Sequence, residues 1–299
     1  MLFKTCQKIQ NINKFALQNL FLARNFCFKS TNQNAEANLS YGTENHEGIA
    51  VLGLNRAKAK NSFSVSLVKD LRSHIDSLAH DNKVRVLVLR SLVPGVFCAG
   101  ADLKERATLT PTQVSAFVTS LRKLLSDIEQ LPMPVIAAID GVALGGGLEM
   151  ALACDIRVAA DNAKMGLVET KLAIMPGAGG TQRLPRVINA ALAKELIFTS
   201  RVFNGVEAEK MGICNHSVQQ NAEGNAAFVK ALALAEEILP NGPIGVRMAK
   251  KAIDKGLQVD LSTGFAIEEA CYAQLIPTKD RLEGLKAFAE KRKPNYKGE

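Results

Sequence analysis

Three short apolar runs, each followed by a helical pattern, constrain the fold of this chain more than any other feature. The runs are GIAVLGL at 48–54, VRVLVL at 84–89 and VIAAID at 135–140, and none alternates regularly between apolar and polar residues. Amphipathic helical patterns follow the first two runs at 64–78 and 114–131, and LEMALA follows the third. Such strands are typical of a parallel sheet that is covered on both faces. The sequence therefore predicts an α/β fold.

The last third of the chain has a different character. Short strands are predicted at 156–159 and 165–167, and helical patterns dominate from about residue 185 to the end. We expect helices at 190–200, 206–211, 226–239, 245–255, 262–275 and 280–292. The predicted organisation is a targeting segment and linker at 1–36, an α/β core at 37–235 and a C-terminal helical region at 236–299.

The first 30 residues are basic and contain no acidic residue. They interleave Leu, Ile and Phe with Lys, Asn and Gln, a composition typical of a mitochondrial transit peptide rather than a secretory signal. We expect the mature protein to begin between about residues 27 and 40. No apolar run reaches the roughly 18 residues of a membrane span, so no membrane insertion is predicted.

The cysteines and histidines do not predict a metal site or a disulfide framework. The chain has six cysteines without CxxC pairing and four histidines without metal-pair spacing. Cys98 and Cys154 lie in apolar stretches, where reduced thiols act as small hydrophobic side chains.

Two turns between a strand and a helix carry the chemistry that we predict. FCAGADLKE, at 97–105, and GVALGGGLE, at 141–149, both place small residues directly before a helix. In a parallel sheet such turns lie at the same edge, where ligands bind. The N–H groups of Ala101 and Gly146 could therefore converge on one oxygen atom as an oxyanion hole. The alternative is that the glycines serve packing only.

Two glutamates accompany these turns in otherwise apolar surroundings. Glu149 follows the three glycines, and Glu169 lies twenty positions later in MGLVETKLAI. Two carboxylates in one pocket can hold a water molecule and move its proton. Alone, each would more often be a helix cap or part of a solvated face.

Taken together, these motifs resemble the enoyl-CoA hydratase/isomerase, or crotonase, superfamily. The resemblance covers about residues 45–299 and rests on FCAGADLKE, IDGVALGGGLEMALACDIRVAA, MGLVETKLAIMPGAGGTQRLPR and LEGLKAFAEKRKPNYKG. It implies a crotonase (ClpP-like) fold of repeated ββα units with parallel sheets, plus a C-terminal helical trimerisation region. Homotrimers or hexamers, as dimers of trimers, are expected.

The resemblance also implies a role for each motif residue. Ala101 and Gly146 would bind the thioester oxygen, while Glu149 and Glu169 would hold the attacking water and Glu169 would donate the α-proton. Hydration would be syn and would need no metal or redox cofactor. Coenzyme A would be part of the substrate rather than a cofactor. Contacts with coenzyme A are expected from Arg56, Lys58, Ala101, Asp102, Leu103, Lys104, Phe288 and Lys291, in addition to Gly146.

These contacts divide by position. Asp102, Leu103 and Lys104 would surround the nucleotide end of coenzyme A, and Arg56 and Lys58 would contact phosphates. Phe288 and Lys291 would close the pocket from the last helix, either of the same chain or of a neighbouring subunit. The alternatives are ordinary surface charge for Arg56, Lys58 and Lys291, and a helix cap for Asp102.

The stretches AKMGLVETKLAI and AIEEACYAQLIPTKDRLEGL favour one branch of the superfamily. That branch hydrates 3-methylglutaconyl-CoA to 3-hydroxy-3-methylglutaryl-CoA during leucine degradation, in the mitochondrial matrix. A short-chain enoyl-CoA hydratase or isomerase of fatty-acid oxidation remains the alternative.

A secondary RNA-binding role is a further alternative from a different class of function. Basic side chains lie in or before the first predicted helix, namely Lys58, Lys60, Lys69, Arg72 and His74. However, Val65 interrupts the series, Asp70 opposes it, and no aromatic stacking platform lies nearby. Such a series is more often a solvated helix face.

Overall fold

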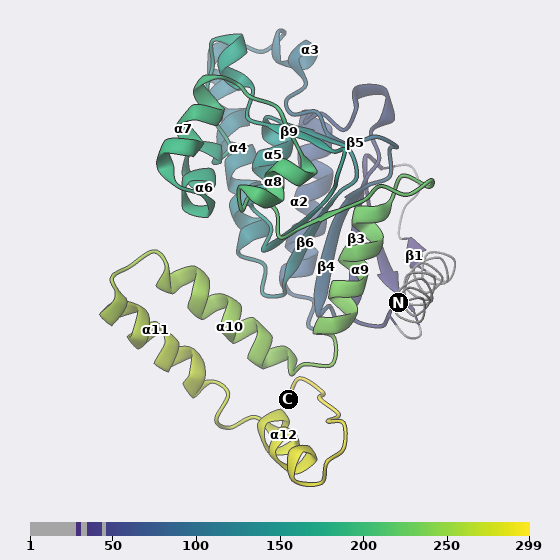
Figure 1. Cartoon of the computed structure of the whole chain (residues 1–299), viewed down its shortest axis with the longest axis vertical. Helices are drawn as coiled ribbons and strands as arrows, with labels where there is room; N and C mark the ends of the chain where they lie inside the picture. Colours follow the sequence, from purple (N-terminus) through teal and green to yellow (C-terminus); the bar gives the residue numbers. More distant parts are fainter. Residues whose placement is uncertain (1–27, 31–34, 44–45) are drawn as a thin grey trace, which may run out of the picture.

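A large, mostly parallel sheet forms the centre of the protein (Figure 1). The computed structural model describes residues 28–30, 35–43 and 46–299. Within these residues the strand order is β1-β2-β3-β4-β6-β8-β11. The bounds are β1 Phe28–Ser30, β2 Ala37–Gly42, β3 Ile49–Leu54, β4 Val86–Ser91, β6 Val135–Ile139, β8 Ile156–Ala160 and β11 His216–Val218. From β3 to β11 all neighbours pair in parallel, whereas β1 and β2 form an antiparallel edge.

Both faces of this sheet are buried, which explains why its strands are apolar at consecutive positions. Alternate residues such as Ile49, Val88 and Ile136 pack against α9 (Ala226–Ile238). The residues between them, including Leu52 and Leu89, belong to a second core on the opposite face. That core also contains the buried faces of α2 (Val65–Ala79) and α4 (Pro111–Glu129). The parallel sheet predicted from the continuous apolar runs is confirmed.

A smaller sheet lies over that second core and carries the turns of interest. Its strand order is β10-β9-β7-β5, with bounds Phe203–Asn204, Lys164–Gly166, Val142–Leu144 and Val96–Cys98 respectively. Strands β5, β7 and β9 are parallel, and β10 joins β9 in antiparallel orientation. Each strand has only two or three residues, too few to produce a periodic sequence pattern.

Shorter helices connect the strands and surround the small sheet. They are η2 Ala57–Ala59, α3 Leu103–Arg106, α5 Gly146–Leu152, η3 Glu169–Leu172, α6 Gly180–Val187, α7 Ala190–Phe198 and α8 Gly205–Lys210. Side-chain caps fix several of the helix starts: Ser64 caps α2, Asp102 caps α3 and Thr110 caps α4. Helix α6 was not predicted, because it begins with glycine and contains Pro185.

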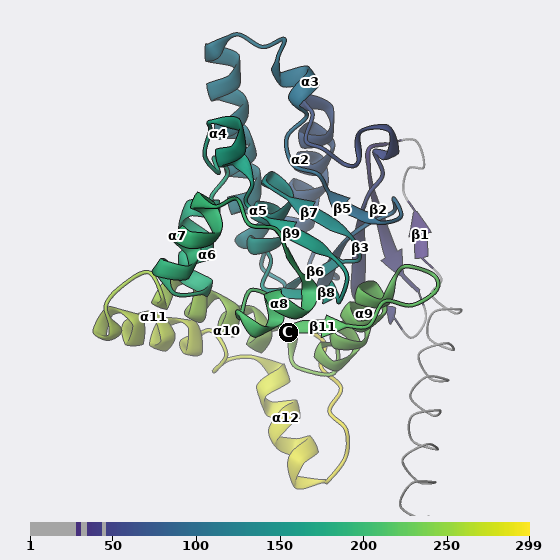
Figure 2. The same ribbon diagram turned by 45° about the horizontal axis from the view of Figure 1, so that its top comes forward.

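The last three helices extend away from the sheets (Figures 1 and 2). They are α10 Pro243–Gly256, α11 Leu261–Ala273 and α12 Lys279–Ala289. Helix α10 is held to the core by Lys250, which donates to Asp155 Oδ2 at 2.7 Å, and by Arg247, which donates to Val84 O at 3.2 Å. All six predicted C-terminal helices are present. The predicted boundary at 235/236 falls within α9, which lies on the sheet.

Two other sequence expectations can be followed in the described residues. The predicted targeting segment lies mostly outside them, although residues 28–30 form β1. Cys98, Cys154, Cys214 and Cys271 are buried free thiols, as expected for reduced cysteines. No helix in the described ranges combines the length and apolar character that a membrane-spanning segment requires.

Candidate active site

The two predicted turns lie against each other at one edge of the small sheet. Strands β5 and β7 are parallel, with Val96 opposite Val142, so the segments that follow them leave at the same end. A Cβ at Gly100 would lie 2.8 Å from Leu144 O and 3.5 Å from the Gly146 nitrogen. Side chains would separate the turns, and the glycines therefore permit their close approach.

The N–H groups of Ala101 and Gly146 are available at this junction. Phe63 holds the first turn by donating from its N–H to Gly100 O at 2.7 Å and by accepting from Asp102 N–H at 3.0 Å. Among the described residues, neither Ala101 N–H nor Gly146 N–H donates to another backbone group. Gly146 is the first residue of α5, where an N–H has no partner inside the helix.

Glu149 lies one turn into α5 and is almost fully buried, with 2% of its surface exposed. Its Oε1 accepts hydrogen bonds from Ala178 N–H at 2.8 Å and from Gly180 N–H at 2.7 Å. Burial raises the pKa of Glu149, and the two N–H donors oppose this rise. Glu149 is therefore held in one orientation by the loop that precedes α6.

Glu169 begins η3 and faces the same region. Its Oε1 lies 3.1 Å from the place of a Cβ at Gly145, and its buried Oε2 has no hydrogen-bond partner among the residues that the structure describes. Burial, and after it the charge of Glu149, raises the pKa of Glu169 to about 7. The two carboxylates therefore interact, and Glu169 can carry a proton at neutral pH.

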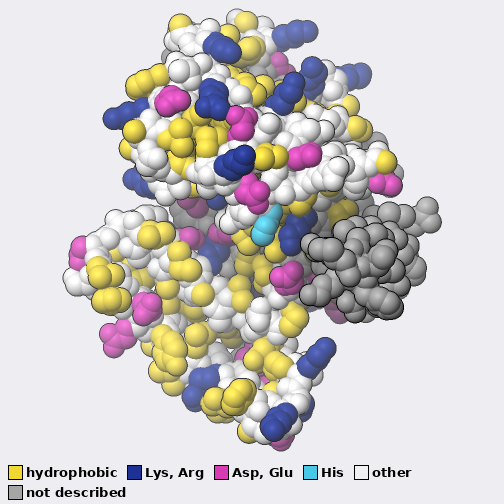
Figure 3. Space-filling view, viewed as in Figure 1, with side chains coloured by type: hydrophobic (Ala, Val, Ile, Leu, Met, Phe, Trp, Pro, Cys, Tyr) yellow, Lys and Arg dark blue, Asp and Glu magenta, His cyan; other side chains and the backbone are white. Residues whose placement is uncertain are grey.

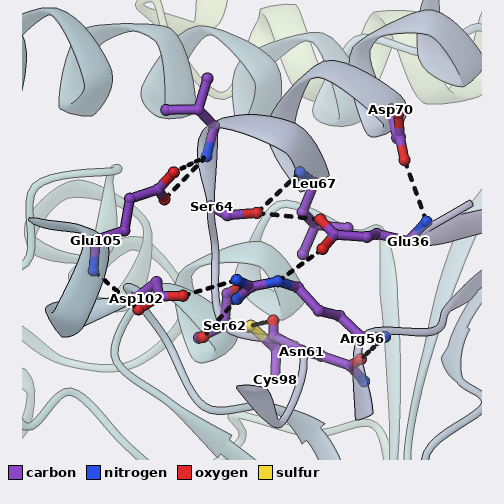
Figure 4. Close-up of polar contacts among 11 residues, drawn as sticks. Glu36, Arg56, Asn61, Ser62, Ser64, Leu67, Asp70, Cys98, Asp102 and Glu105 are labelled. Atoms are coloured by element: carbon purple, nitrogen blue, oxygen red, sulfur yellow. Dashed lines mark hydrogen bonds and ion pairs between the residues drawn. The ribbon is translucent and has the colours of Figure 1, made fainter. Parts of the chain in front are cut away.

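Arg56 and Asp102, which are both expected to contact coenzyme A, form an ion pair with each other (Figure 4). Arg56 Nη2 lies 2.8 Å from Asp102 Oδ2, and its Nε donates to Glu36 Oε1 at 2.8 Å. Asp102 also accepts from Lys104 N–H and Glu105 N–H as the cap of α3. The alternative reading of Asp102 as a cap is the one its contacts match. This network fixes the turn that contains Ala101.

The remaining expected contacts with coenzyme A divide into two groups. Lys58, Leu103 and Lys104 are exposed on η2 and α3, beside the Ala101 turn. Phe288, 87% exposed, lies in the last turn of α12, and Lys291 follows the end of that helix. Figures 1 and 2 place α3 and α12 at opposite ends of the molecule. Phe288 and Lys291 therefore do not reach this site within one chain.

Two of the five basic residues considered for RNA have partners within the protein. Arg72 forms an ion pair with Asp127 of α4, and His74 Nε2 lies 3.1 Å from Ala37 O. Lys58, Lys60 and Lys69 are exposed.

Sequence reasoning missed the loop that holds Glu149. Its N–H donors belong to Ala178 and Gly180 in the motif PGAGG, and Gly179 has φ +118°. The cluster of three glycines between two apolar segments was the available signal for such a loop. Its partner could not be identified, because Glu149 lies about 30 positions earlier in the chain.

The fold and these turns define a crotonase-fold protein with a paired-glutamate site. Residues 44–299 match the family model "Enoyl-CoA hydratase/isomerase", and the chain belongs to that family. It is 64% identical over 256 residues to the human protein "Methylglutaconyl-CoA hydratase, mitochondrial", a match that covers 86% of this chain and 76% of that protein. It is also 54% identical over 276 residues to mouse "Enoyl-CoA hydratase domain-containing protein 2, mitochondrial", covering 92% and 93% respectively.

Solved structures agree with this assignment. The crystal structure of enoyl-CoA hydratase from Bacillus anthracis superposes with a TM-score of 0.84 at 48% identity. The superposition covers 88% of this chain and all of that one. The family and fold implied by the sequence motifs are confirmed.

Proposed function

We propose that this protein is a mitochondrial hydratase that adds water to the α,β-double bond of 3-methylglutaconyl-CoA, giving 3-hydroxy-3-methylglutaryl-CoA in leucine degradation. One observation carries the reaction type: two interacting carboxylates, buried Glu149 and partly buried Glu169, lie beside two N–H groups that have no backbone partner among the described residues. The likeness to methylglutaconyl-CoA hydratases supports the substrate. The names of these relatives support a mitochondrial location. Within the mitochondrion we propose the matrix.

The proposed reaction uses one proton on the carboxylate pair. Ionised Glu149 takes a proton from water, and the hydroxyl oxygen bonds to the β-carbon. The thioester carbonyl then carries negative charge, which the N–H groups of Ala101 and Gly146 stabilise. Protonated Glu169 donates its proton to the α-carbon, so the carboxylate pair holds one proton before and after the reaction. Water and the thioester are the only reactants. Coenzyme A enters as part of the thioester and not as a separate cofactor.

Exposed cations beside the Ala101 turn support a binding surface for coenzyme A. We assign phosphate contacts to Lys58 and Lys104, and Leu103 adds an exposed apolar surface for the nucleotide end. Arg56 and Asp102 would support this surface through their ion pair. A direct contact from Arg56 would require its guanidinium to leave Glu36 or Asp102.

The C-terminal helices support a homo-oligomer, for which we propose trimers that pair into hexamers. Large apolar side chains are exposed along α10, α11 and α12, as Figure 3 shows. They include Ile253, Leu257, Leu261, Phe265, Tyr272, Leu285 and Phe288, each at least 59% exposed. Contact with other subunits would bury these side chains and could bring Phe288 and Lys291 to a neighbour's site.

Steady-state kinetics with crotonyl-CoA and 3-methylglutaconyl-CoA, measured side by side, test the proposed function. We expect hydration of both thioesters, with a higher kcat/KM for 3-methylglutaconyl-CoA. A clear preference for crotonyl-CoA would instead indicate a short-chain hydratase. Migration of the double bond without addition of water would indicate an isomerase.

A further inference from the structure

The loop that holds Glu149 is itself held by two arginines from the side opposite Glu149. The N–H groups of Ala178 and Gly180 point to Glu149 Oε1. The carbonyl groups of the same loop accept hydrogen bonds from arginine: Arg183 Nη1 donates to Ala178 O at 3.0 Å, and Arg122 Nε donates to Gly177 O at 2.9 Å. The orientation of Glu149 therefore depends on side chains that do not touch it by a hydrogen bond.

Arg183, in α6, is fixed more firmly than a surface arginine. Its side chain is only 11% exposed, and its Nη2 lies 2.8 Å from Glu129 Oε2 of α4. The same nitrogen donates to Ser126 Oγ at 3.2 Å, and Nε donates to Glu129 at 3.2 Å. The planar guanidinium thus joins α4, α6 and the loop in a single geometry.

The glycines of the loop show how closely these groups fit. A Cβ at Gly179 would lie 2.2 Å from Arg183 Nη1, and one at Gly180 would lie 3.1 Å from Glu149 Oε1. A side chain at Gly179 would therefore displace Arg183, and one at Gly180 would crowd the Glu149 carboxylate.

We propose that Arg183, assisted by Arg122, is a positioning residue that holds Glu149 in place and keeps it ionised for its role as the base. The proposal rests on the hydratase reaction proposed above. It adds a function for two side chains that the reaction itself does not use. A loop displaced by 1 Å can reduce a rate by about 100-fold, so a distant anchor can control kcat without contacting substrate.

The charges around Glu149 support the electrostatic part of this role. Burial raises the pKa of Glu149, the N–H groups of Gly180 and Ala178 oppose the rise, and the positive charges of Arg183 and Arg122 oppose it further. Glu169 faces the same region with a negative charge when ionised. Glu129 of α4 partly balances Arg183, but its side chain is 43% exposed and is screened by water.

The experiment compares full-length Arg183→Gln, Arg183→Lys and Arg122→Gln with a matched control, Arg186→Gln. Arg186 also lies in α6 but is exposed, and within the described part of the chain its side chain bonds only to Gln182 of its own helix. The control therefore removes the same charge from the same helix and leaves the loop untouched. Each variant is assayed for hydration of the enoyl-CoA thioester across pH, with circular dichroism and thermal melting as measures of folding.

For Arg183→Gln we expect kcat to fall about 10- to 100-fold with KM within a few-fold of wild type. The acidic limb of the kcat/KM profile should move to higher pH, because the base loses a stabilising cation. Arg183→Lys should keep that limb near its wild-type position, because the positive charge remains. Its kcat should still fall, since one ammonium group cannot make the several hydrogen bonds of the planar guanidinium. Arg122→Gln should shift the limb in the same direction by less.

An Arg183→Gln enzyme with the kcat and pH profile of Arg186→Gln would overturn the proposal. If Arg183→Gln does not fold, Arg122→Gln decides, and an unshifted acidic limb there would overturn it equally. If the proposed hydratase function is itself wrong, neither wild type nor Arg186→Gln will hydrate an enoyl-CoA. That result is distinct from failure of the positioning role, in which both enzymes remain active.

Discussion

Gly145 lies against the carboxylate of Glu169: a Cβ at residue 145 would be 3.1 Å from Oε1. The backbone at Gly145 has φ +52° and ψ −123°, a combination that favours glycine. We predict that Gly145→Ala lowers kcat at least about tenfold by displacing Glu169, and costs about 1 kcal/mol of stability through backbone strain. Steady-state hydration and thermal melting measure the two effects.

Gly95→Ala is the matched control for this strain. Gly95 also has a positive φ, +72°, but apart from its chain neighbours no atom of the described residues lies within 4 Å of an added Cβ. It should show a similar loss of stability with near-normal kcat. Equal kcat values for the two variants would show that residue 145 does not determine the position of Glu169.

Replacing either glutamate by glutamine should abolish most hydratase activity. The amide keeps the shape of the side chain but cannot donate or accept the transferred proton, so Glu169→Gln and Glu149→Gln should each lose about 10²–10⁴-fold in kcat. Affinity for coenzyme A, measured by calorimetry, should remain within a few-fold. A Glu169→Gln enzyme with normal turnover would remove Glu169 from the proposed mechanism.

The pH dependence should reflect one proton shared by the carboxylate pair. Since Glu169 must be protonated and its pKa is about 7, kcat/KM should decline as the pH rises through about 7. On the acidic side activity should decline as Glu149 becomes protonated. Hydration and dehydration should have the same bell-shaped profile, because the singly protonated pair is active in both directions and neither direction consumes a proton. Profiles that differ in the two directions would contradict this scheme.

Gly146→Pro should remove one donor from the oxyanion hole. Proline has no N–H and is tolerated at the first position of a helix, so kcat should fall about 10²–10³-fold with little loss of secondary structure. Gly146→Ala keeps the N–H but adds the same Cβ, which would lie 3.2 Å from the Phe63 ring. The ratio of the two kcat values isolates the hydrogen bond. A ratio near one would exclude this N–H from the reaction.

The helices and buried strands could be predicted because each carries its pattern locally. Helix α2 was predicted at 64–78 from apolar spacing and found at Val65–Ala79. The small sheet could not be predicted in the same way. Strands such as β10, Phe203–Asn204, owe their conformation to pairing with distant neighbours rather than to their own residues.

In the candidate site, too, the features encoded in local motifs could be predicted, and those that depend on distant residues could not. The two turns and both glutamates lie in recognisable motifs, and the structure brings them together. The partner of Arg56 could not be foreseen, because Asp102 is 46 positions away and a lone basic residue near a motif is equally consistent with a phosphate contact. Glu129 and Arg183 are similarly remote in sequence, at a separation of 54.

The exposed C-terminal helices predict the assembly of the protein. We expect light scattering to give three or six times the monomer mass, unchanged on dilution over the micromolar range. Leu257→Glu places a charge at a site that is 83% exposed in one chain, so it should dissociate the assembly without unfolding the core. A wild-type monomer at all concentrations would contradict this prediction and also the role of Phe288 and Lys291 in a neighbour's pocket.

The reactivity of the buried cysteine thiols depends on transient opening of the structure around them. Burial raises the pKa of Cys98, Cys154 and Cys214 to about 12 each, so almost no reactive thiolate exists while the surrounding structure stays closed. Alkylation at these positions must therefore wait for transient exposure. Because Cys98 ends β5, just before the Ala101 turn, its labelling rate would measure how often that turn opens. A bound thioester should slow this reaction at Cys98 more than at Cys214, which lies outside the two turns.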